Sequence, residues 1–164
     1  MSDPSDATAL LRRFLGTWEG TGHGRFPTIE PFRYSETLRF TAREGLPDLF
    51  YEQSTWLIQD EGEPSHWEAG FLLPKEDGSI HLLNAQQSGR TEVLIGRLRE
   101  DESGLELVLE SASHTHDPRM VATTRTYQLR GDELRYEACM ATDQVAELQR
   151  HLECELVRVN AAVR

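Results

Sequence analysis

Residues 16–27 read GTWEGTGHGRFP, with glycine at every second position from Gly16 to Gly24 except at Trp18. Two residues is the repeat of a β-strand, so the pattern predicts a strand with one face almost free of side chains. A run of glycine in a strand marks a sharp bend or the close approach of another group. Two interpretations therefore stay open: a strand that curves at a barrel corner, or a bare backbone wall against which a flat ligand lies.

Alternation of apolar and polar residues continues through most of the chain. Further candidate strands cover residues 33–42, 49–59, 66–73, 79–86, 91–99, 105–113, 121–130 and 133–140. Turn sequences such as Glu76-Asp77-Gly78 separate them. Short loops between strands indicate an antiparallel meander, and about ten strands favour a closed up-and-down barrel over a sandwich, because closure removes exposed edges. The predicted fold is all-β.

The N-terminal residues predict a different local structure. Residues 1–6 are expected to form a loosely held, flexible tail, and Asp6 is placed to cap a short helix from Ala7 to Leu15. This helix would plug one end of the barrel, with Trp18 packed near that floor. With no linker in the sequence, residues 7–160 are predicted to form a single domain.

Composition and charge exclude several classes of function. The 164 residues contain 17 basic and 28 acidic side chains, a net charge of −11 that repels nucleic acid and anionic membrane surfaces. Neither a signal peptide nor a long apolar run is found, so a cytoplasmic location is expected. Cys139 and Cys154 are expected to be free thiols. His114 and His116 are too few ligands for most metal sites.

Two motifs together resemble a known family. The GxWxGxGxGx[YF]P pattern of residues 16–27 is similar to the N-terminal signature of the nitrobindins, β-barrels shaped like fatty-acid-binding proteins and also found as the C-terminal domain of a THAP-domain protein. The segment from Met140 to Arg158, which contains His151, is similar to the C-terminal signature of that family. The resemblance implies one haem b per chain, nitric oxide binding, and isomerisation of peroxynitrite to nitrate by a monomer or homodimer.

The resemblance also implies a set of site residues. His151 would be the axial ligand to the haem iron, and the porphyrin would approach the backbone of the glycine strand directly. Anionic haem propionates need local cations, for which Arg25 and Arg125 are candidates beside Arg119. The expected haem-binding residues are His151, Gly20, Gly22, Gly24, Thr28 and Arg119, and no catalytic residue is expected beyond the iron.

Two further alternatives stay open. Apolar residues at helical spacing in residues 143–159 predict an amphipathic helix, whereas the resemblance implies a loop followed by a closing strand that begins near His151. The alternative function is a haem-free carrier of a fatty acid or other small apolar ligand, which needs an inward-facing arginine pair such as Arg39 and Arg125. A barrel filled by its own side chains would bind nothing.

Overall fold

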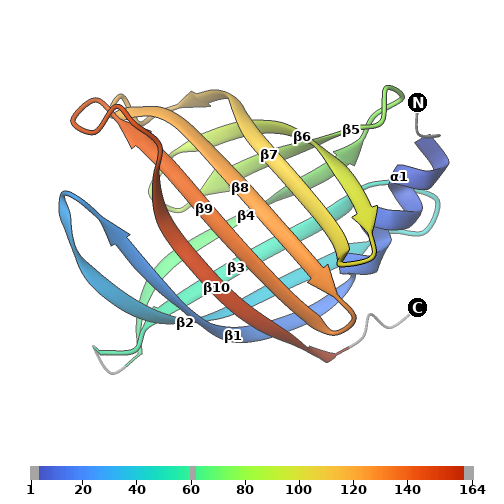
Figure 1. Ribbon diagram of the computed structural model, residues 1–164, viewed down its shortest axis with the longest axis horizontal. Helices are drawn as coiled ribbons and strands as arrows, with labels where there is room; N and C mark the ends of the chain where they lie inside the picture. The colour runs from blue at the N-terminus through green and yellow to red at the C-terminus, as the bar shows by residue number, and fades with distance from the viewer. Residues whose placement is uncertain (1–3, 60–61, 161–164) are drawn as a thin grey trace.

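The computed structural model describes residues 4–59 and 62–160, and ten antiparallel strands account for most of them. The strands are β1 (Gly16–Phe26), β2 (Ile29–Ala42), β3 (Leu49–Leu57), β4 (Glu63–Pro74), β5 (Ser79–Gln86), β6 (Thr91–Asp101), β7 (Gly104–Thr115), β8 (Met120–Arg130), β9 (Glu133–Thr142) and β10 (Gln149–Asn160). Each strand pairs with the next along the chain, and β1 also pairs with β10 (Figure 1). The predicted closed up-and-down barrel is confirmed.

A short helical segment lies across one end of the barrel (Figure 1). Helix α1 (Pro4–Leu11) continues into a 3₁₀ turn, η1 (Arg12–Phe14). The helix begins three residues earlier than expected, so Asp6 lies within it rather than capping it, and only residues 1–3 of the expected tail fall outside the described residues. No helix in the described part of the chain is long and apolar enough to cross a membrane.

Trp18 anchors this closed end, as expected. Its side chain is fully buried, and its indole N–H donates to the carbonyl oxygen of Phe14 at 2.8 Å. The guanidinium of Arg158 lies over the indole ring, 4.1 Å from its centre. Because the strands alternate in direction, the loops β1–β2, β5–β6, β7–β8 and β9–β10 all lie at the opposite end (Figure 1).

The glycines of β1 make room for aromatic rings of the protein itself. A Cβ atom added to Gly22 would overlap the ring of Tyr34, and one added to Gly24 would overlap the ring of Phe32. Both rings come from residues directly opposite on β2. A Cβ on Gly20 would overlap the backbone of β10. The bare wall expected for a porphyrin is thus covered at Gly22 and Gly24, because two rings already occupy the space that the missing side chains leave.

The closing stretch is a strand, and the helix predicted from its periodicity is wrong. Strand β10 forms backbone pairs with β1 on one side and β9 on the other, which a helix would leave unpaired. The pairing with β9 shifts by one residue between Arg150 and Leu152. Such a β-bulge lets two successive residues face the same side of the sheet, so both His151 and Leu152 line the interior cavity.

Candidate functional site

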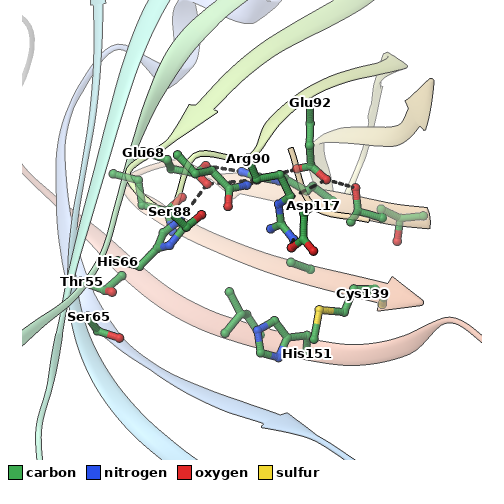
Figure 2. Close-up of a pocket in the computed structure, with 18 of the residues that line it drawn as sticks. Thr55, Ser65, His66, Glu68, Ser88, Arg90, Glu92, Asp117, Cys139 and His151 are labelled. Carbon is green, nitrogen blue, oxygen red and sulfur yellow. Dashed lines mark hydrogen bonds and ion pairs between the residues drawn. The ribbon is translucent and has the colours of Figure 1, made fainter. Parts of the chain in front are cut away.

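A cavity of about 520 Å³ opens at the end of the barrel away from α1. This volume lies within the range of about 300–1,000 Å³ that is typical of ligand pockets. The two sides of the cavity differ in chemistry. Apolar groups line it from β2, β9 and β10, namely Phe32, Tyr34, Ala138, Met140, His151 and Leu152. Charged groups line it from β4 to β8 together with His66, namely Glu68, Arg90, Glu92, Asp117, Arg119 and Arg125. Figure 2 labels His66, Glu68, Arg90, Glu92 and Asp117 among them.

The imidazole of His151 is held in one orientation by the backbone of β1. Its Nδ1 lies 3.1 Å from the carbonyl oxygen of Arg25, and because a carbonyl can only accept, Nδ1–H is the donor. The lone pair is then on Nε2. The rings of Phe26 and Phe32 contact the imidazole edge-on, with centroids 5.9 and 6.3 Å away. Burial lowers the pKa of His151, and the charge of Arg90 adds to this effect, so the ring is neutral at pH 7.

A buried ion pair occupies the opposite side of the cavity. Arg125 contacts both carboxylate oxygens of Glu68, one of them at 3.1 Å, and lies 3.5 Å from Glu92. His66 and Tyr51 donate to the same carboxylate at 2.9 and 3.0 Å. Burial alone would raise the pKa of Glu68, but Arg125 and the bond from His66 outweigh it and hold the pKa well below its usual range. Arg125 is therefore already engaged within the protein.

The inward arginine pair needed for a fatty-acid carrier is not formed. Arg125 points inward but is neutralised by Glu68, while Arg39 is exposed on the outer face of β2. Arg39 and Arg125, the candidates for this role, are therefore not available as a pair to bind a carboxylate tail.

A third buried acid, Glu36, lies beside Tyr136, which lines the cavity. The carboxylate of Glu36 accepts from Tyr136 at 2.5 Å, and the hydroxyl of Tyr136 lies 3.0 Å from that of Tyr34 and accepts from Gln53 at 2.9 Å. The other oxygen of Glu36 is buried without a hydrogen-bond partner. Burial raises the pKa of Glu36 to about 8, so this acid is mostly neutral at pH 7.

The remaining residues expected at the site are scattered. Arg119 lines the cavity mouth, but it is exposed and bonds to Asp117 through Nε at 3.0 Å and Nη2 at 3.1 Å. Thr28 is exposed in the β1–β2 turn and does not line the cavity. Arg25 contributes its carbonyl to His151, and together with Gly24 it lines a neighbouring groove of about 620 Å³ that shares Phe32, His151 and Leu152 with the cavity. The structure thus places His151 with Arg119 in the cavity and with Gly24 and Arg25 in the neighbouring groove, whereas Thr28, Gly20 and Gly22 line neither.

Sequence reasoning named Arg119 and Arg125 on the charged side of the cavity but missed Arg90 and the buried acids. Glu36 was recognisable, because it alternates in phase with the apolar Tyr34 and Leu38 on one strand face. Glu68 is likewise on the inward-facing side of β4, next to the exposed Trp67. Arg90 follows a turn and gives no periodic signal. No group of three or more His, Cys, Asp or Glu residues is placed to hold a metal ion within residues 4–59 and 62–160.

Comparison with known proteins identifies related chains. A family model described as a THAP4-like, heme-binding β-barrel domain matches residues 7–158. Peroxynitrite isomerase Rv2717c of Arabidopsis thaliana is 36% identical over 148 residues, which cover 90% of this chain and 86% of the relative. Peroxynitrite isomerase 2 of Mycobacterium marinum is 36% identical over 156 residues, 93% of each chain. The crystal structure of Rv2717c from Mycobacterium tuberculosis superimposes with a TM-score of 0.84 at 36% identity, covering 93% of this chain and 96% of that one.

Proposed function

Because this chain belongs to the family of THAP4-like, heme-binding β-barrel domains, we propose that its cavity binds one haem b through His151. We further propose that the loaded protein binds nitric oxide and isomerises peroxynitrite to nitrate, the reaction for which relatives of similar length are named. The observation that carries the proposal is the state of His151. A neutral imidazole whose Nδ1–H bonds to a carbonyl, leaving Nε2 free, is what a metal ligand requires.

The rest of the cavity fits the same group. Haem is a flat, largely apolar ring with two carboxylates at one edge, and the cavity has an apolar side next to His151 and a charged side at its mouth. Ferric iron supplies Lewis-acid chemistry toward a peroxo oxygen when it is bound. The chain's own residues would position the ligand and exclude water. The carbonyl of Arg25 orients the imidazole of His151, and Phe32, Met140 and Leu152 cover the side of the cavity next to it.

The test is a titration of the purified protein with ferric haem, followed in the Soret band. The parent protein should saturate at one haem per chain, and nitric oxide should shift the band. His151→Ala should abolish saturable binding, because it removes the proposed axial ligand. His81→Ala is the matched control, since this histidine does not line the cavity, and it should bind as the parent does. Equal haem affinity in parent and His151→Ala would refute the assignment.

The proposed reaction has its own measurement. The haem-loaded parent should increase the rate at which peroxynitrite is lost and the yield of nitrate, while the haem-free protein should not. An unchanged nitrate yield with haem bound would leave a haem-binding protein without isomerase activity.

A further inference from the structure

Arg90 lies in the turn between β5 and β6, at the mouth of the cavity. The turn is fixed by two backbone bonds of 2.9 Å, from Gln86 N–H to the carbonyl of Arg90 and from Gly89 N–H to the carbonyl of Gln86. The side chain extends into the cavity, where only 20% of it is exposed (Figure 2). Its backbone position is therefore well determined, and its guanidinium is largely removed from solvent.

The N–H donors of this guanidinium are unpaired among the described residues. Its Nε is excluded from solvent and has no hydrogen-bond partner. The nearest carboxylate oxygens are on Glu92, 3.9 Å from Nε, and on Asp117, 3.8 Å from Nη1. Both distances exceed hydrogen-bond length. A buried donor without an acceptor is rare in a folded protein and calls for an acceptor that the protein itself does not supply.

The two nearby carboxylates are occupied by other donors. Glu92 accepts from Thr123 at 3.0 Å through one oxygen and faces Arg125 at 3.5 Å through the other. Asp117 binds the guanidinium of Arg119 through both of its oxygens. The two carboxylates therefore balance the positive charge of Arg90, but neither accepts a hydrogen bond from its guanidinium. Arg119 and Arg125, which also line the cavity, differ from it because both have carboxylate partners.

We propose that Arg90 binds a planar oxyanion in the cavity through its N–H groups. A guanidinium presents its donors in one plane, which matches two oxygens of a carboxylate or of nitrate. One source is a propionate of haem, and this arm rests on the proposed function; the other is a small free oxyanion such as nitrate, which does not need haem. Arg90 would then bind the anionic carboxylate at the cavity mouth, the role for which Arg119 is the candidate from the sequence.

The first arm of the test compares ferric haem with its dimethyl ester, which lacks the anionic carboxylates. The parent should bind haem about tenfold more tightly than the ester, the size of one charge-assisted hydrogen-bonded contact at a partly exposed site. Arg90→Gln should remove this preference without weakening the affinity for the ester. Arg119→Gln is the matched control and should keep the preference, because that arginine is engaged with Asp117.

The second arm uses ¹⁵N-labelled, haem-free protein. Sodium nitrate should shift the Nε–H signal of Arg90 saturably, while sodium chloride at the same ionic strength should not. If nitrate shifts the signal and the parent shows no preference for haem over the ester, the ligand of Arg90 is the small oxyanion. If the parent prefers haem and nitrate causes no shift, the ligand is the propionate. If neither is observed, the proposal is overturned.

Two safeguards keep the outcomes separate. If the parent fails to bind haem at all, the proposed function fails, while the nitrate titration still decides the role of Arg90. If Arg90→Gln does not fold, as judged by circular dichroism, Arg90→Lys replaces it. Lysine keeps a charge between Glu92 and Asp117 but lacks the planar donor pair, so the preference should fall several-fold, and an unchanged preference would overturn the proposal.

Discussion

Replacing Glu36 by glutamine should stabilise the protein at neutral pH and remove part of its pH dependence. The folded protein holds this side chain as a neutral acid, because burial raises its pKa from 4.5 to about 8. Glutamine has nearly the same shape and can still accept the hydrogen bond from Tyr136. It differs by having no proton to lose when the chain unfolds into water.

The size of the effect follows from proton linkage. Below pH 4.5 the carboxyl is protonated in both the folded and the unfolded protein, and its full contribution to the free energy of unfolding is present. Between pH 4.5 and 8 the unfolded chain releases the proton while the folded protein retains it, so stability is lost as the pH rises. Each pH unit in this window costs about 1.4 kcal/mol. Between pH 5 and pH 7 the parent should therefore lose about 2.5 kcal/mol relative to Glu36→Gln.

Urea denaturation followed by tryptophan fluorescence measures this difference. The free energy of unfolding is determined for both proteins at pH 5, 6 and 7, and the gap between them is plotted against pH. Other titrating groups, such as Glu68, are present in both proteins and cancel in the gap. A gap that does not change with pH would show that Glu36 is ionised in the folded protein, and the reasoning from its burial would be refuted.

Two further substitutions test the packing around the cavity. Arg125→Met should lower the free energy of unfolding, measured by urea denaturation, by about 3–5 kcal/mol, because it leaves the carboxylate of Glu68 buried without its charge partner. Adding Glu68→Gln should recover much of this loss, and a loss below about 1 kcal/mol for Arg125→Met would contradict the reasoning. Gly22→Ala should lower the free energy of unfolding by about 2–4 kcal/mol, because its Cβ would overlap the ring of Tyr34. Thr21→Ala, on the exposed face of the same strand, should change this free energy little, and equal losses for the two variants would contradict the packing.

The fold was predictable because its signals are local. Alternation along each strand and glycine at the turns depend on neighbouring residues, and they were enough to place the barrel strands. The closing strand was ambiguous from its residues alone, because Leu148, Leu152 and Leu156 fit a helix by spacing. Only its pairing with β1 and β9 resolves the ambiguity, and those partners lie elsewhere in the chain.

The site was predictable only in part. The motif predicts His151 as a haem ligand, which stays a prediction, and the orientation of its ring depends on a carbonyl 126 residues away in the sequence. The pair of Glu68 and Arg125 is separated by 57 residues and depends on how the strands are aligned around the barrel. The glycine pattern left a bend and a ligand wall open, because the rings of Tyr34 and Phe32 that fill the space at Gly22 and Gly24 belong to the neighbouring strand. Such contacts between distant residues carry no pattern in a single sequence.

The bond between His151 and Arg25 joins the first strand of the barrel to the last. Pairing of strands so distant in sequence carries a large loop-closure cost, so it is expected to form late in folding. The imidazole can take its final orientation only after that seam has closed. If His151 binds haem as proposed, its ligation in a refolding experiment would therefore report on completion of the barrel, whereas circular dichroism would report on the earlier hairpins.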